Sequence, residues 1–151
     1  MIKPDIIITR EPEPDERINL NETFVVPELA RFTPLRRENT ELEIFHASVS
    51  CKWTIRSDRT QNSRAEALNL LTNRKGRAPH IAVVTAEPLP SRLASIAIGT
   101  GDIDCTYHVA LHELQDVVSA ELWPDAHDML SIMVEGKRLR DISDLPLDLA
   151  I

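Results

Sequence analysis

Aromatic residues are scarce in this sequence, at 4% of 151 residues. A hydrophobic core must therefore be built mainly from Ile, Leu, Val and Ala. Cysteine is scarce as well, because Cys51 and Cys105 are the only two in the chain. Two cysteines do not make the disulfide framework of a small secreted protein, so we expect a reducing, cytoplasmic setting.

Long hydrophobic runs are also missing. The chain begins Met-Ile-Lys-Pro-Asp, which is not the apolar segment of a secretion signal. Its apolar runs are far too short to cross a bilayer, so we expect no membrane partner. A hydrophobic content of 42% and a charged content of 27% are typical of a folded globular chain. The length suits one domain, which we assign to residues 1–151.

Acidic residues outnumber basic ones, and the net charge of -7 at first argues against a nucleic-acid partner. The basic residues are unevenly distributed, however. Residues 52–77 carry seven of them against two acidic residues, so this stretch is +5 and the rest of the chain is -12. A local basic face can hold DNA phosphates on an acidic protein, although a solvated helix is the commoner explanation. The seven are Lys52, Arg56, Arg59, Arg64, Arg74, Lys75 and Arg77.

Short β-branched runs alternate with helical spacings, which predicts an α/β domain with a mixed β-sheet flanked by helices. We predict strands at residues 6–9, 24–26, 44–55, 80–86 and 129–134. We predict helices at residues 59–73, 91–98 and 105–121, the first capped by Asp58 and ended by Lys75-Gly76. The segments 11–17, 28–43 and 139–151 are predicted to be loop, irregular helix or extended chain, with a turn at 135–137.

Ser50 and Lys52 are two residues apart on a predicted strand, so their side chains share one face of the sheet. Cys51 then points to the other face, where a small buried thiol is expected. A lysine that points inward from a central strand needs an anionic partner. Asp5, at the start of a strand that can lie alongside, and Glu66, on the following helix, are the two candidates.

Two carboxylates and a lysine suit metal-assisted hydrolysis of a phosphodiester. The carboxylates of Asp5 and Glu66 would hold a hard cation such as Mg²⁺, which lowers the pKa of its bound water. Lys52 would stabilise the hydroxide or the negative charge that develops on the phosphate. On spacing alone, a structural ion pair explains the same residues more often.

Arg56, Asp58 and Arg59 form an Arg-x-Asp-Arg cluster at the predicted junction of strand and helix. Arginine donates two hydrogen bonds to guanine in the major groove, and a carboxylate accepts from the amino group of cytosine. The cluster is therefore chemically matched to neighbouring G and C bases. A helix cap with a surface salt bridge is the alternative explanation.

Other polar groups favour ordinary structural roles. His108 and His112 are four residues apart on a predicted helix, but no third zinc ligand lies at a suitable spacing. Asp102 and Asp104 are expected to cap the start of that helix, close to Cys105. The two tryptophans, Trp53 and Trp123, are expected to be packing residues rather than platforms for base stacking.

The stretch from His46 to Arg77, with its Ser-Cys-Lys and Arg-Ser-Asp-Arg motifs, closely resembles the NgoMIV-type restriction endonucleases, the CCGG-reading branch of the PD-(D/E)xK nucleases. The resemblance covers nearly the whole chain and is weak only in residues 11–43 and 119–130. Further segments that carry it are Pro79–Pro88, Pro90–Arg92, Gly99–Cys105, Gly136–Leu139 and Asp141–Leu149.

This resemblance implies a restriction-endonuclease-like fold and a role for each matching residue. Pro4-Asp5 matches the PD motif, with Asp5 as a metal ligand, and Ser50 and Lys52 match the Ser-x-Lys, with Lys52 catalytic. In this branch the second carboxylate is displaced to the next helix, where Glu66 falls. The residues that match base-reading positions are Arg56, Asp58, Arg59 and Arg92.

The resemblance also implies Mg²⁺-dependent cleavage of double-stranded DNA at a G/C-rich palindrome containing CCGG. Because a palindrome presents two equivalent half-sites, we expect a homodimer or homotetramer. Members of the family carry a long helical region before the PD motif, so we expect this chain to be their C-terminal portion, truncated at the N-terminus. Two alternatives remain open: an inactive or merely DNA-binding remnant, and a repair or structure-specific nuclease on the same scaffold.

Overall fold

The computed structural model describes residues 4–99, 101–120 and 123–150, and the side chains of all of these except residues 57–60. The chain forms two compact units. The first comprises residues 1–6 and 47–151, and the second comprises residues 7–46. The first unit holds most of the secondary structure and all the residues of the candidate site.

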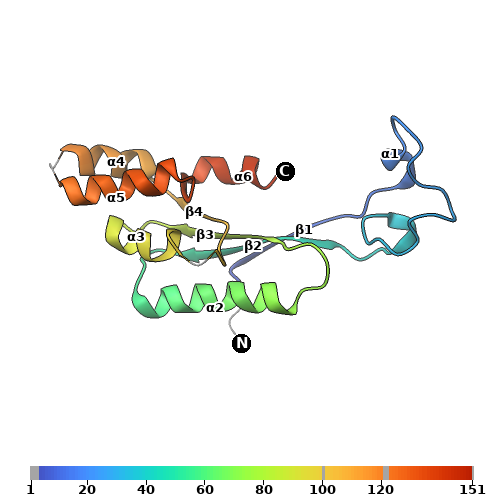
Figure 1. Ribbon diagram of the computed structural model, residues 1–151, viewed down its shortest axis with the longest axis horizontal. Helices are drawn as coiled ribbons and strands as arrows, with labels where there is room; N and C mark the ends of the chain where they lie inside the picture. Colours follow the sequence, from blue (N-terminus) through green and yellow to red (C-terminus); the bar gives the residue numbers. More distant parts are fainter. Residues whose placement is uncertain (1–3, 100, 121–122, 151) are drawn as a thin grey trace. The chain divides into compact units, whose positions relative to one another are not determined.

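A five-stranded β-sheet is the central element, with its strands in the order β1-β2-β3-β4-β5 (Figure 1). Neighbouring strands from β2 to β5 are parallel. The last residues of these strands pair in one row, in which Lys52 pairs with Thr85, Thr85 with His108, and His108 with Asp141. The strands are β1 (Ile6–Arg10), β2 (Ile44–Lys52), β3 (His80–Thr85), β4 (Cys105–His108) and β5 (Leu139–Asp141).

Helices connect the parallel strands and cover the sheet, so the predicted α/β class is confirmed. Figure 1 shows α4 and α5 lying side by side, and these two helices also contact each other. Ile96 of α3 packs on Val83 of β3, and Leu139 of β5 joins the core formed with α3, α4 and α5. The helices are α2 (Ser57–Asn73), α3 (Pro90–Ala97), α4 (Leu111–Ala120), α5 (Pro124–Glu135) and α6 (Leu145–Asp148), with a 3₁₀ turn at Ile142–Asp144.

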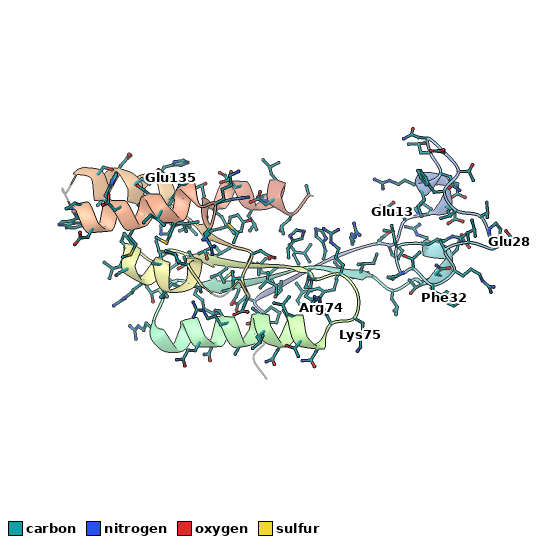
Figure 2. All side chains as sticks on the ribbon, in the orientation of Figure 1. Glu13, Glu28, Phe32, Arg74, Lys75 and Glu135 are labelled. Atoms are coloured by element: carbon teal, nitrogen blue, oxygen red, sulfur yellow. The ribbon has the colours of Figure 1, made fainter. Side chains whose placement is uncertain are left out.

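The second unit has little regular structure apart from the parts of β1 and β2 that it includes. It contains the short helix α1 (Asp15–Ile18) and a 3₁₀ turn at Arg37–Asn39. Its buried Arg36, 4% exposed, donates from Nε to Asp15 at 2.6 Å and from Nη1 to the carbonyl oxygen of Leu29 at 2.8 Å. Phe32, labelled in Figure 2, is 95% exposed. Arg36 therefore links α1 to the chain around Leu29.

Several predicted elements are confirmed, while two predicted boundaries are wrong. The strands at 6–9 and 80–86 and the helix at 91–98 are present as β1, β3 and α3. The strand predicted at 44–55 ends at Lys52. The helix predicted from residue 59 begins at Ser57, and its N-cap is Arg56, so the prediction that Asp58 is the cap was wrong.

Two other predictions were wrong because a short pattern was assigned to the wrong period, and a third was wrong because a side chain binds the backbone. Within the predicted helix 105–121, residues 105–108 form β4 and residues 111–120 form α4. All four residues of β4 are buried, so no alternation marked them as a strand. Residues 129–134 belong to α5, where Leu130 and Met133 are buried and Ile132 is 61% exposed, which is helical spacing. Residues 24–26 form no strand, because Asn19 Oδ1 accepts from the N–H groups of Phe24 and Val25.

None of the helices in the described part of the chain has the length and apolar character needed to cross a membrane.

The neighbouring residues Met133 and Ile132 test the packing of α5. Met133 is 0% exposed in the core, so Met133→Ala should leave a cavity and lower the free energy of unfolding by about 2–5 kcal/mol. Ile132→Ala, on the exposed side of the same helix, should change it by less than about 1 kcal/mol. Urea unfolding measures both variants. Equal losses would contradict the observed packing of α5.

Candidate active site

The carboxyl end of β2 brings Asp5 and Lys52 together. Asp5 lies one residue before β1, and its Oδ2 accepts from Lys52 Nζ at 2.9 Å and from the backbone N–H of Cys51 at 2.7 Å. The side chain of Lys52 is 21% exposed and that of Asp5 is 45% exposed. The N–H of Cys51 and the ammonium group of Lys52 hold the pKa of Asp5 below its usual value, so this carboxyl is ionised at neutral pH.

Ser50 and Glu66 complete this group from the buried side. Ser50 is two residues before Lys52 on β2, in register with Val83, and is 5% exposed. Its Oγ is one of three buried hydroxyl oxygens that have no hydrogen-bond partner in the described part of the chain. Glu66 comes from α2 and is also 5% exposed. The strand β2 thus supplies Ser50 and Lys52 to the site, and the helix α2 supplies Glu66.

The pKa of Glu66 is shifted by its surroundings. Burial raises the pKa of its carboxyl, the positive charge of Lys52 opposes this rise, and the negative charge of Asp5 adds to it. Because the charges of Lys52 and Asp5 both act on Glu66, the three side chains are electrostatically coupled. A carboxyl with a raised pKa that faces a lysine and a second carboxylate is the kind of perturbed group that gathers at functional sites.

Cys51, between the two site residues, is exposed, so the prediction of a buried thiol was wrong. Its register partner is Val84, on the opposite sheet face from Lys52. Partial desolvation and the nearby charge of Asp5 raise the pKa of the Cys51 thiol. The thiol is therefore protonated at neutral pH and is a poor nucleophile.

Two of the predicted DNA-reading arginines lie at the starts of helices. Arg56 is exposed and is the N-cap of α2, and Arg92 is in the first turn of α3 with its side chain 50% exposed. The side chains of Asp58 and Arg59 lie outside the described residues. Figure 2 shows Arg74 and Lys75 at the other end of α2, where both are exposed. The basic stretch therefore runs along α2 and presents charge at both of its ends.

Glu87 is a residue that sequence reasoning missed. It is 0% exposed and follows β3 by two residues. Its Oε2 accepts from the backbone N–H of Ile55 at 2.7 Å, and its Oε1 accepts from that of Leu89 at 3.1 Å. Arg92 Nη1 lies 3.7 Å from Oε2. The position of Glu87 just after a buried parallel strand could have indicated a functional role, because ligands of such sheets bind at the carboxyl ends of the strands.

His108 and Asp104 make structural hydrogen bonds, but in other places than predicted. His108 ends β4 rather than lying on a helix with His112. Asp104 caps no helix, and its Oδ2 accepts from the N–H of Ile81 at 2.7 Å. Trp53 is 76% exposed and Trp123 is 54% exposed, contrary to the prediction that both are packing residues.

The charge on Glu66 gives a pH-dependent prediction. A carboxyl whose pKa is raised by folding costs stability once the pH rises through that pKa. Glu66→Gln should therefore be more stable than the wild type at neutral pH, and the difference should vanish below pH 4.5, the ordinary pKa of glutamic acid. Urea unfolding at the two pH values measures this.

Glu135→Gln is the matched control, since Glu135 is an exposed glutamate at the end of α5. This variant should show no such pH-dependent gain. A Glu66→Gln protein that is less stable than the wild type at neutral pH would contradict the buried, charged state of Glu66.

Comparison with known proteins identifies the family. The family model of the NgoMIV restriction enzyme matches residues 1–151. The chain is 59% identical over 150 residues to the type II restriction enzyme NgoMIV of Neisseria gonorrhoeae, and the match covers 99% of this chain and 52% of that protein. This chain thus spans about half the length of its relative.

A complex of the restriction endonuclease PspGI with substrate DNA is similar at a TM-score of 0.42 and 16% identity, over 69% of this chain and 39% of that one. This structural similarity is too low to support the family assignment, which rests on the sequence comparisons. The family model covers every residue that the site comprises. The chain belongs to the NgoMIV restriction enzyme family.

Proposed function

We propose that this chain is a type II restriction endonuclease that hydrolyses phosphodiester bonds in double-stranded DNA, with Mg²⁺, at a G/C-rich palindrome containing CCGG. The observation that carries the proposal is the ion pair of Lys52 with Asp5, at 2.9 Å, in the electrostatic field of buried Glu66. A carboxylate pair beside a lysine is the donor set that metal-assisted phosphodiester hydrolysis needs. The family assignment supports the same chemistry.

The donor set fits a magnesium ion. Mg²⁺ binds oxygen ligands and commonly uses one or two carboxylates, with waters and substrate phosphates filling its other positions. Among the described residues no cluster of three or more His, Cys, Asp or Glu side chains is arranged to hold a metal ion, so the proposal rests on two carboxylates. Asp5 and Glu66 would hold the ion. When bound, it would lower the pKa of its water and stabilise charge on the phosphate.

The chain's own residues have separable tasks. The side chain of Lys52 is 21% exposed, and its ammonium group would stand beside the scissile phosphate and stabilise the negative charge that develops there. Asp5 accepts a hydrogen bond from Lys52 and so holds its ammonium group in place. The hydrogen bond from the N–H of Cys51 keeps the Asp5 carboxylate oriented. The partnerless hydroxyl of Ser50 would hydrogen-bond to a carboxylate or water in the assembled site.

Sequence reading would belong to the arginines at the helix starts. Arg56 and Arg92 would donate to guanine, and Asp58 and Arg59 would complete the cluster that reads neighbouring G and C bases. The other basic side chains near α2 would hold phosphates, so that binding would weaken as salt is raised. A two-fold symmetric palindrome would be bound by a homodimer or a homotetramer.

Lys52→Ala tests the proposed catalytic lysine. With Mg²⁺ and DNA fully bound, single-turnover cleavage should fall by at least about 100-fold, because the group that stabilises the transition-state charge is lost. Binding to the same duplex without metal should remain within about threefold, since many phosphate contacts share that energy. Gel-based cleavage and fluorescence anisotropy measure the two effects.

Lys137→Asn is the control for loss of a lysine away from the site. Lys137 is exposed and has a φ of 56°, a conformation that asparagine adopts readily. Its cleavage rate should equal that of the wild type. Unchanged cleavage by Lys52→Ala would exclude the catalytic assignment, and binding without cleavage by the folded wild type would favour a DNA-binding fragment.

A further inference from the structure

Glu87 connects two segments that are distant in the sequence. Through Oε2 it holds the backbone of Ile55, the residue before Arg56 at the start of α2. Through Oε1 it holds Leu89, the N-cap of α3, three residues before Arg92. One carboxylate thus fixes the starts of both helices that carry the proposed DNA-reading arginines.

The burial of this carboxylate needs compensation, and the structure supplies it. A fully buried charge is costly unless it is paired and hydrogen-bonded. Glu87 has two backbone N–H donors, and the Arg92 guanidinium lies 3.7 Å away. The start of α3 adds the favourable end of a helix dipole. An apolar residue at this position would leave the N–H groups of Ile55 and Leu89 without their acceptor.

Glu87 is itself held rigidly by its neighbours. Its backbone N–H donates to Thr85 Oγ1 at 3.1 Å, and its carbonyl oxygen lies 3.0 Å from His108 Nε2. His108 Nδ1 accepts from the N–H of Ala110 at 3.1 Å, so Nε2 carries the hydrogen and donates to Glu87. Thr85 and His108 are themselves paired in register at the ends of β3 and β4. Glu87 is therefore anchored to the β-sheet through Thr85 and His108.

We propose that Glu87 is a positioning residue for DNA reading, an inference that rests on the proposed function. Its carboxylate fixes Arg56 and Arg92 relative to each other, and this geometry sets the discrimination between the CCGG-containing site and other sequences. Glu87 touches no DNA in this account, since it is 0% exposed. It acts through the backbone of Ile55 and the guanidinium of Arg92.

Glu87→Gln tests the proposal with nearly the same shape. A carboxamide has one acceptor oxygen, so one of the two backbone N–H groups would face an NH₂ group instead. We expect the affinity ratio between a CCGG duplex and a scrambled duplex to fall by about tenfold or more. Fluorescence anisotropy with the full chain, without metal, measures the ratio. Because unfolded protein lowers both affinities equally, the ratio is insensitive to simple destabilisation.

Arg92→Ala and the double variant show whether Glu87 acts through Arg92. If it does, the double variant should lose little more discrimination than Arg92→Ala alone, whereas independent losses would multiply. Glu135→Gln, an exposed glutamate in α5, should leave the ratio unchanged. A folded Glu87→Gln protein with the wild-type ratio would overturn the proposal. A wild type without preference for CCGG would instead refute the proposed function.

Thr85→Val takes the place of Glu87→Gln should that variant not fold. Valine keeps the shape of threonine and removes the oxygen that accepts from the Glu87 N–H. The affinity ratio between the CCGG and scrambled duplexes should fall by about threefold, since one neutral hydrogen bond that orients Glu87 is lost. An unchanged ratio in this variant would overturn the positioning role.

Discussion

The register of the parallel strands is the constraint on which the rest of the structure depends. Because β2, β3, β4 and β5 run in one direction, their last residues meet in one row, and the chain leaves the sheet repeatedly at the same edge. Ligands of open α/β sheets bind outside this edge. Here it holds Lys52 at the end of β2 and, just beyond β3, the buried carboxylate of Glu87. A slip of one residue in β2 would turn Lys52 to the opposite face and separate it from Glu66.

At that edge the two buried carboxylates of Glu87 and Glu66 are compensated to different extents. Glu87 is buried with its donors in place, so its charge is compensated within the fold. Glu66 is buried beside Lys52 and Asp5, and its raised pKa shows that this compensation is incomplete. A bound cation would complete it, so the proposed catalytic carboxylate is one that the fold alone does not satisfy. Functional sites commonly retain such unfavourable groups at the expense of stability.

Much of the fold and of the site follows from local sequence patterns. The pairing of Asp5 with Lys52 could be predicted, because a lysine that points inward from a strand needs an anionic partner. Asp5 was a candidate because it lies at the start of another predicted strand. The buried strand β4 and the helix α5 could not, because four buried residues without alternation and a short apolar run fit either period. Glu87 was missed for another reason. Its partner Ile55 is 32 residues away, and no spacing rule reveals a side chain that bonds a distant backbone N–H.

The central claim is that the residues gathered at the end of β2 cut DNA at a specific site. The most direct test is to incubate the purified chain with Mg²⁺ and a plasmid that carries several CCGG sequences, and to sequence the ends produced. The account predicts that the ends fall within G/C-rich palindromes containing CCGG, and that a metal chelator abolishes them. Ends at unrelated sequences, or intact DNA from a folded chain at every protein concentration, would contradict it.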